Sequence, residues 1–339
     1  MIYLDTTSAS SWRHPSGLAR VSRRLAAELG TAALAAVWPA VGLGLRPEDW
    51  VLTPELFSEP ERPGLTAFLA RRPCRVAAIY HDAIPLKHPD ITWPKSVERH
   101  PAYMKLLAQF DRVWAVSEAS RQELLNFWRW QGVTSPPTVE VLTLGADGAG
   151  VPRAGGAPGI PATPARIVSV GILEPRKNQA VLMDAYEVLR REGLVFELHL
   201  VGRVNPHFGS PLAARAARIA ADLPGLHHHR ALTDGEVAGL IATARATAFP
   251  SIAEGCGLPV LESLWQGVPC RCSDIAPVLE NARGGGCVAV EGNRRESWIR
   301  ALRRVITDDE HRRALAATAA ARPLPPWLDA ATVLRRALA

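Results

Sequence analysis

Two acidic residues flank a short uncharged stretch in "AEGCGLPVLESLWQGVP", which covers residues 253–269. The stretch between Glu254 and Glu262 begins with Gly255, Cys256, Gly257, Leu258 and Pro259. Glycines let a ligand approach the backbone closely, and the free N–H groups at a helix start carry partial positive charge. Ionised carboxylates only accept hydrogen bonds, so the two acids suit hydroxyl groups. The pattern predicts a site for an anion and for hydroxyls; the alternative is an ordinary helix start beside an acidic surface loop.

A second motif, "VGILEPRKN", places two adjacent cations just after an expected strand. The strand should end at Gly171, and Arg176 and Lys177 should stand where the next helix begins. Cations at a helix start oppose the macrodipole unless an anion binds there. Arg176 could grip phosphate oxygens in a fork while Lys177 supplies a point charge. The alternative is a pair of exposed cations with no ligand.

Two weaker motifs lie in the first half of the chain. In "IYHDAIPLKHPD", His81 and Asp82 follow an expected strand, which is where a residue facing a ligand would stand. In "HPSGLARVSRRLAAEL", Gly17 opens an expected helix that carries Arg20 in its first turn. The alternatives are a structural histidine and a solvated basic helix face.

Metal-binding patterns are weak in this sequence. Three adjacent histidines at 227–229 cannot converge on one ion if they lie on a strand, because alternate side chains point to opposite faces. No D-x-D pair is present to carry Mg²⁺ on a nucleotide, and the five cysteines form no C-x-x-C pair. We therefore expect no metal, no other cofactor, no disulfide and a reducing compartment.

The composition sets broad limits on fold and partners. A chain of 339 residues favours two domains. The net charge of +6 and the pI of about 9.4 suit anionic ligands, nucleic acid or an acidic membrane surface without choosing among them. No signal peptide is evident at the start. Pro39 and Gly42 interrupt the uncharged stretch 29–45, so we expect a short buried strand and a turn there rather than a membrane span.

Short apolar runs alternate with amphipathic ones along the chain. In the first half we expect strands at 2–5, 75–81, 112–116 and 138–144, and helices at 17–29, 96–109 and 117–130. In the second half we expect strands at 166–171, 196–202, 226–230, 246–251 and 268–273, and helices at 176–191, 210–221, 233–244, 258–266, 294–307 and 323–339. Capping pairs are expected at Ser120 with Glu123 and at Thr233 with Glu236. The segment 145–165, rich in Gly, Ala and Pro, is typical of a linker.

This alternation on both sides of one linker predicts an α/β protein with two doubly wound parallel-sheet domains, each covered by helices on both faces. Ligands of such sheets bind at the carboxyl ends of the strands, where the strand order reverses. The motifs above stand at such strand ends.

Taken together, the motifs resemble those of the retaining glycosyltransferases of family 4, in a branch that builds bacterial polysaccharides. "FPSIAEGCGLPVLESLWQGVP" is similar to the family's F-P-S-x-x-E-G-F-G-L-P-x-L-E-A-x-A-x-G-x-P, "VGILEPRKN" to V-G-x-x-E-P-R-K-N, and "HDAIPLKHP" to H-D-x-I-P-L-x-x-P. The resemblance implies the GT-B fold, in which two Rossmann-like domains face an interdomain cleft. Residues 1–150 would form the acceptor-side domain, 151–322 the nucleotide-sugar donor domain, and 323–339 a helix that crosses back to the first domain.

The resemblance also implies roles for individual residues. Glu254 would contact the hydroxyls of the donor sugar and Glu262 the ribose. The implied catalytic residues are His81, near the anomeric centre, and Glu254, Arg176 and Lys177. The implied donor-binding residues are Gly17, Gly171, Gly202, Gly255, Cys256, Gly257, Leu258 and Glu262. The residues assigned to the acceptor side are Arg20 and Asp82.

Two positions depart from the family pattern. Cys256 stands where a phenylalanine is usual, which changes the expected sugar pocket. Ile172 stands where some members carry a second phosphate-binding arginine, which leaves more of the charge to Arg176.

The implied reaction is transfer of a sugar, with retention and without a metal, from a nucleotide-diphosphate sugar. GDP-mannose or a UDP-sugar is the implied donor, and a hydroxyl of a glycan, a glycolipid or a small molecule is the acceptor. We expect a cytoplasmic protein with no nucleic-acid partner, in peripheral contact with the inner membrane face if its acceptor is lipid-linked. A GT-B epimerase, a GT-B phosphorylase and a non-catalytic GT-B module that binds nucleotide sugar remain alternatives. A dinucleotide oxidoreductase is disfavoured because no G-x-G-x-x-G follows the first strand.

Overall fold

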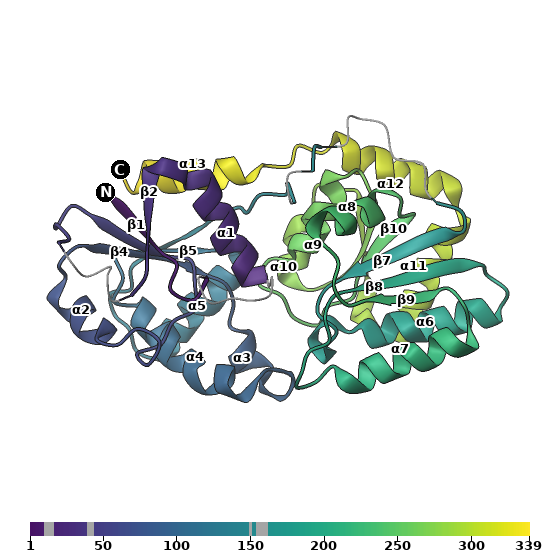
Figure 1. Ribbon diagram of the computed structural model, residues 1–339, viewed down its shortest axis with the longest axis horizontal. Coiled ribbons are helices and arrows are strands. Elements are labelled where there is room, and N and C mark those ends of the chain that lie inside the picture. Colours follow the sequence, from purple (N-terminus) through teal and green to yellow (C-terminus); the bar gives the residue numbers. More distant parts are fainter. Residues whose placement is uncertain (10–16, 39–43, 149–150, 154–161) are drawn as a thin grey trace. The chain divides into compact units, whose positions relative to one another are not determined.

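The computed structural model describes residues 1–9, 17–38, 44–148, 151–153 and 162–339. The chain divides into two compact units (Figure 1). The first consists of Met1–Gly145 with Pro325–Ala339, and the second of Ala146–Leu324. The sequence placed these divisions at 150/151 and 322/323. The linker expected at 145–165 falls partly outside the described residues, at 149–150 and 154–161.

The first unit is built on a parallel six-stranded sheet in the order β2-β1-β3-β4-β5-β6. Its strands are β1 (Ile2–Asp5), β2 (Ala33–Ala36), β3 (Trp50–Thr53), β4 (Arg75–Tyr80), β5 (Arg112–Ala115) and β6 (Thr138–Val141). Four of the six were expected, and β3 was missed. The expectation of a buried strand within 29–45 is wrong about burial, because β2 is the edge strand and leaves Leu34 48% exposed.

Helices cover both faces of this sheet (Figure 1). They are α1 (Gly17–Leu29), α2 (Leu65–Arg71), α3 (Ile84–Lys87), α4 (Pro94–Leu107), α5 (Glu118–Trp130) and α13 (Trp327–Ala337). Side chains from α2, α4 and α5 form one core with the sheet, and α1 packs against α13. The predicted cap at Ser120 is wrong, because α5 begins three residues earlier and Ser117 accepts the amide of Ser120 at 3.0 Å.

The second unit repeats the design with the strand order β12-β11-β10-β7-β8-β9, again all parallel. Its strands are β7 (Ala165–Val170), β8 (Phe196–Val201), β9 (Leu226–His229), β10 (Ala246–Phe249), β11 (Cys270–Ser273) and β12 (Cys287–Val290). The first five confirm the expected strands. Because β7 lies between β8 and β10, the strand order reverses between β7 and β10.

Seven helices of the described chain cover this second sheet. They are α6 (Gln179–Arg191), α7 (Ser210–Asp222), α8 (Asp234–Ala242), α9 (Leu258–Trp265), α10 (Ala276–Ala282), α11 (Arg295–Thr307) and α12 (Asp309–Ala321). The predicted capping box of Thr233 and Glu236 is confirmed at the start of α8. Helices α6, α7 and α11 bury one apolar face of the sheet, and α8 covers part of the other.

Two further properties bear on function. Across the residues that the structure covers, no helix combines the length and apolar character needed to cross a bilayer. All five cysteines are free thiols.

Candidate functional site at the strand-order reversal of the second unit

The two strongest sequence motifs meet at the carboxyl ends of β7 and β10, where the strand order of the second sheet reverses. Gly171 and the turn to Lys177 follow β7, and the segment 250–254 follows β10. A backbone hydrogen bond of 2.8 Å from the amide of Ile252 to the carbonyl of Arg176 ties the two segments together. This is the place in an open parallel sheet where ligands bind.

The two cations of "VGILEPRKN" lie just before a helix rather than in its first turn. Arg176 and Lys177 end a 3-10 turn, Pro175–Lys177, and α6 begins at Gln179. Asn178 between them has a left-handed φ of 51°, which interrupts the helical backbone. The prediction of one helix from residue 176 is therefore wrong at its start.

Glu254 is the shared partner of both cations. The Nζ atom of Lys177 lies 2.5 Å from Oε1 of Glu254, and Nη1 of Arg176 lies 3.4 Å from the same oxygen. Arg176 also donates to the carbonyl of Ala253 at 3.0 Å and pairs with Glu174 at 2.7 Å. The structure thus brings together three of the four residues to which the resemblance gave catalytic roles.

Water screens the charges of this cluster little, because the side chains of Lys177 and Glu254 are only 12% and 9% exposed. Burial lowers the pKa of Lys177, although the charge of Glu254 opposes this effect. Burial alone would raise the pKa of Glu254, but the charges of Lys177 and Arg176 outweigh it and leave that pKa lowered. The lowered pKa of Glu254 favours its carboxylate form, and one oxygen of that carboxylate lies close to both cations. An incoming anion would meet two cations that are already held in place.

The glycines after β7 and β8 let the two strand ends approach each other closely. Gly202 has a φ of 146°, and a Cβ atom placed there would lie 2.2 Å from the carbonyl oxygen of Gly171. The side chain of Lys177 passes over Gly171, with its Cδ 3.4 Å from where a Cβ would be. A side chain at Gly202 would therefore displace the backbone at Gly171, and one at Gly171 would contact the side chain of Lys177 itself.

We expect Gly202→Ala to lower the free energy of unfolding by about 1–3 kcal/mol, because the new methyl group overlaps a backbone atom that cannot swing aside. Urea unfolding measures this change. Gly239→Ala is the matched control: a Cβ there meets no atom within 4 Å, and its helical position favours alanine. Equal stability of the two variants would contradict the prediction.

The stretch 253–269, with its two flanking acids, opens α9 as its residue types predicted. Gly257 has a left-handed φ of 85° at the N-cap position, no side chain caps the first turn, and Leu258 begins the helix. The carbonyl of Cys256 accepts a hydrogen bond of 2.6 Å from Asn281. Burial raises the pKa of the Cys256 thiol to about 12, so at neutral pH it lines the site as a small apolar group. Gly255 lies in the same turn, between Glu254 and Cys256.

Glu262 lies on α9, and its residue is only 8% exposed. A Cβ atom placed on Gly148 would be 3.4 Å from Cγ of Glu262, so the chain passes close to this side chain. Both flanking acids of the motif are thus buried around one helix start, rather than displayed on a surface.

His81 and Asp82, two of the predicted residues of the first unit, have clear local partners. Nε2 of His81, just after β4, lies 2.7 Å from the carbonyl of Pro54, and burial lowers the pKa of His81, which favours the neutral ring. Oδ1 of Asp82 accepts a hydrogen bond from the amide of Ile84 at 2.9 Å.

Gly17 is the exposed first residue of α1, and Arg20 lies half-buried in the first turn of that helix. Residues 14–16, which precede Gly17 in this motif, lie outside the described residues.

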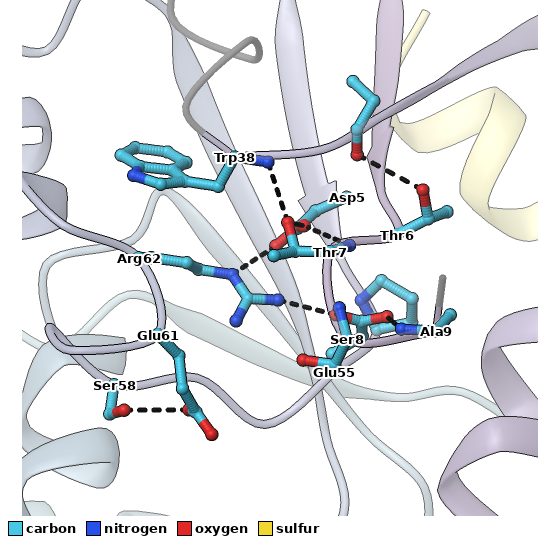
Figure 2. Close-up of polar contacts among 12 residues, drawn as sticks. Asp5, Thr6, Thr7, Ser8, Ala9, Trp38, Glu55, Ser58, Glu61 and Arg62 are labelled. Carbon is cyan, nitrogen blue, oxygen red and sulfur yellow. Dashed lines mark hydrogen bonds and ion pairs between the residues drawn. The ribbon is translucent and has the colours of Figure 1, made fainter. Parts of the chain in front are cut away.

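A buried charged triad at the strand-order reversal of the first sheet escaped the sequence analysis (Figure 2). Nε of Arg62 donates to Asp5 at 2.7 Å, and its Nη2 donates to Glu55 at 2.6 Å. All three side chains are at most 4% exposed. Asp5 is the last residue of β1 and Glu55 comes two residues after β3, so an acid at or near the end of each strand was the available sequence signal.

The triad fixes the loop that leaves β1 (Figure 2). Glu55 accepts the amides of Ser8 at 2.7 Å and Ala9 at 2.6 Å. Asp5 accepts both the amide and the hydroxyl of Thr7. Burial raises the pKa of Glu55, although the two amide hydrogen bonds oppose this effect. The first residues of the loop are therefore held by charged acceptors.

Comparison with known proteins agrees with this geometry. Residues 155–322 match the family model described as glycosyl transferases group 1. The chain is 31% identical to the serotype-specific mannosyltransferase WbdA of Escherichia coli over 218 residues, which is 60% of this chain and 26% of that protein. It is 34% identical to a GDP-mannose-dependent alpha-(1-6)-phosphatidylinositol dimannoside mannosyltransferase of Mycobacterium tuberculosis over 161 residues, 46% of this chain and 40% of that one. The chain thus spans well under half the length of these curated relatives.

The fold is also that of a solved structure. The crystal structure of Anabaena Alr3699/HepE in complex with UDP and glucose superposes with a TM-score of 0.74 at 15% identity, covering 99% of this chain and 98% of that one. Two parallel α/β sheets and this likeness confirm the GT-B fold predicted from the sequence. The chain belongs to the glycosyl transferases group 1 family, family 4 of the retaining glycosyltransferases.

Proposed function

We propose that this protein transfers mannose from GDP-mannose to a hydroxyl group of a glycan or glycolipid, with retention of anomeric configuration. The observation that carries the proposal is the cluster of Lys177, Arg176 and Glu254 at the strand-order reversal, beside the uncapped start of α9. Two relatives are mannosyltransferases by name, one of them GDP-mannose-dependent, and this supports the choice of donor.

The chemistry follows from the charges. As the glycosidic bond of the donor breaks, negative charge grows on the leaving diphosphate. Lys177, Arg176 and the amides at the start of α9 stabilise that charge, as the donors of an oxyanion hole do. Glu254, freed in part from its cations by the diphosphate, accepts hydrogen bonds from sugar hydroxyls. Because these groups supply the positive charge, we propose that no divalent metal is required at the diphosphate.

We further propose that the second unit binds the donor and the first unit the acceptor. In this assignment Glu262 holds the ribose, and Gly171, Gly202 and Gly255 let the nucleotide approach the backbone. In the first unit we assign His81 to the reacting sugar, and residues 7–9, held by Asp5 and Glu55, to the acceptor. A cytoplasmic location, with membrane contact for a lipid-linked acceptor, remains a prediction.

Ligand-induced thermal shifts test donor recognition, because a ligand that binds only the native state raises the melting temperature. We expect GDP and GDP-mannose to raise Tm and GMP to raise it much less, because GMP lacks the second phosphate that the cations would hold. UDP and UDP-glucose, then ADP and dTDP, test the other bases. An equal response to GMP and GDP would contradict a diphosphate site.

Transfer itself is measured by mass spectrometry of mannose-terminated acceptors incubated with GDP-mannose, without added divalent metal, and by NMR of the new anomeric centre. An α-linked product from the α-configured donor is expected. Donor binding without transfer across a wide acceptor panel would instead favour a non-catalytic module. Conversion of the donor without any acceptor would favour an epimerase.

A further inference from the structure

A cluster of histidines lies at the edge of the second sheet, on strands β8 and β9. His199 of β8 is the register partner of His227 of β9. Because side chains alternate along a strand, His227 and His229 share the face of His199, and His228 points to the other face. There, Nε2 of His228 lies 2.9 Å from the carbonyl of Gly202. The three adjacent histidines thus diverge, as the sequence predicted. The neighbouring strand β8, however, places further possible metal ligands beside His227.

Glu197, two residues before His199, completes a compact group of ligand atoms. One ligand atom each from Glu197, His199 and His227 lies within 4.8 Å of the other two. Nε2 of His199 is 3.0 Å from Oε2 of Glu197, and the ring centroids of His199 and His227 are 4.7 Å apart. His199 is buried, Glu197 is half-buried and His227 is exposed. The group is therefore built into the sheet at one end and open to solvent at the other.

We propose that Glu197, His199 and His227 bind one transition-metal ion of the Zn²⁺ type, with water in the remaining position. Three protein ligands of His and carboxylate type with one open position form a common coordination set for zinc. Bonds of about 2.0–2.2 Å set tetrahedral ligand atoms roughly 3.3–3.6 Å apart, so ligand atoms that now lie within 4.8 Å of one another would close in by up to about 1.5 Å. The site is separate from the proposed donor site and is not assigned a step in sugar transfer.

The neighbours of the ligands are arranged to orient them. Nδ1 of His199 lies 2.9 Å from Nε2 of His229, so the ring can donate a proton there while Nε2 faces the ion. Arg166 donates to Oε2 of Glu197 at 2.8 Å, and the hydrogen bonds of the Glu197 side chain within the described chain both fall on that one oxygen. Oε1 is thus left for a ligand. Partners of this kind, which hold the ligands rather than the ion, accompany most metal-binding histidines.

The ligand types of the site, two imidazoles and one carboxylate, also determine which kind of ion it would bind. Two imidazoles and one carboxylate suit Zn²⁺, Ni²⁺ or Cu²⁺, whereas Mg²⁺ and Ca²⁺ prefer oxygen ligands throughout. Arg166 offsets the charge of Glu197 and disfavours hard cations, which depend on net negative charge. An ion held by both strands would join edge strand β9 to β8 through side chains, in addition to the backbone hydrogen bonds of the ladder.

Isothermal titration of untagged, metal-free protein with ZnCl₂ tests the proposal, with MgCl₂ titrated in parallel. We expect one Zn²⁺ per chain and no Mg²⁺ binding. Titration with Co²⁺ should give the intense visible absorption of a four-coordinate site. It should give no charge-transfer band from thiolate, which would report binding to cysteines instead.

Two variants of the same strand supply the contrast. His227→Ala removes an exposed ligand and should weaken Zn²⁺ binding by more than the 10–100-fold that loss of a ligand's partner typically costs. His229→Ala removes such a partner and should fall within that range. His228→Ala, on the opposite face, should bind Zn²⁺ like the wild type; Glu197→Gln repeats the ligand test on the other strand.

A wild-type protein that takes up no Zn²⁺ would overturn the proposal, as would a thiolate band with Co²⁺. It would also be overturned if His228→Ala lost as much affinity as His227→Ala. None of these measurements uses sugar transfer, so the result is independent of the proposed reaction.

Discussion

Replacing Lys177 with alanine is expected to lower kcat for sugar transfer by about 10²–10³-fold, the usual cost of losing one group that stabilises charge developing in a transition state. The lysine lies 2.5 Å from Glu254 and only 12% of its side chain is exposed, so its charge acts where water screens it little. Its contribution grows as the bond to the diphosphate breaks. We therefore expect kcat to fall by a larger factor than the KM for donor rises.

The fold should survive this change, because Glu254 keeps Arg176 as a partner at 3.4 Å. Circular dichroism and Tm check that point. Lys105→Ala, at an exposed position of α4, is the matched control and should turn over at the wild-type rate. A Lys177→Ala enzyme whose kcat at saturating donor stays within a few-fold of wild type would remove the lysine from the proposed mechanism.

Replacing Arg62 with methionine is expected to lower the free energy of unfolding by about 3–5 kcal/mol, the typical cost of breaking a buried ion pair by removing one partner. Methionine fills part of the space but leaves Asp5 and Glu55 as buried acids without their cation. Urea unfolding followed by tryptophan fluorescence measures the loss. The signal reports largely on the first unit, where Trp50, Trp114 and Trp128 are buried.

Two controls separate the effect of uncompensated charge from lost packing. Asp5→Asn and Glu55→Gln combined with Arg62→Met should recover part of the stability, because no buried charge is then left unpaired. Arg72→Met breaks an exposed ion pair with Asp111 in the same unit and should cost no more than about 1 kcal/mol. If the triple variant were less stable than Arg62→Met, packing and not charge would explain the loss.

Much of the fold and of the donor site follows from local pattern. Local pattern predicted five of six strands in the second sheet. The pattern was clearest for β7, β8 and β10, whose mainly apolar runs are typical of a parallel sheet with both faces buried. Lys177 and Glu254 are distant in sequence but meet because they follow neighbouring strands, β7 and β10. The strand order reverses between these two strands, which is where ligands of such sheets bind. The order itself came from the structure, since alternation of strands and helices does not specify which strands pair.

The features that were missed depend on tertiary contacts. Arg62 follows a run rich in Pro and Glu and resembles any solvated loop arginine, and only the packing around it makes it a buried centre. The histidines at 227–229 were judged within one strand, whereas Glu197 and His199 reach them through the register of the neighbouring strand. The start of α6 was misplaced because an asparagine with left-handed φ leaves little trace in hydrophobic periodicity.

Helix α13 belongs to the first unit but is translated after the whole of the second unit. Its buried Trp327, Ala331 and Leu334 lie on the helix that packs against α1, whose Val21 and Leu25 are likewise buried. A ribosome completes all of residues 146–324 before it produces this helix, so the second unit can fold while the first still lacks a layer. Domains usually fold in the order in which they are made. Here the part that is translated first would be the last to be completed, and a nascent chain stalled before residue 327 would expose the apolar side of α1 to chaperones.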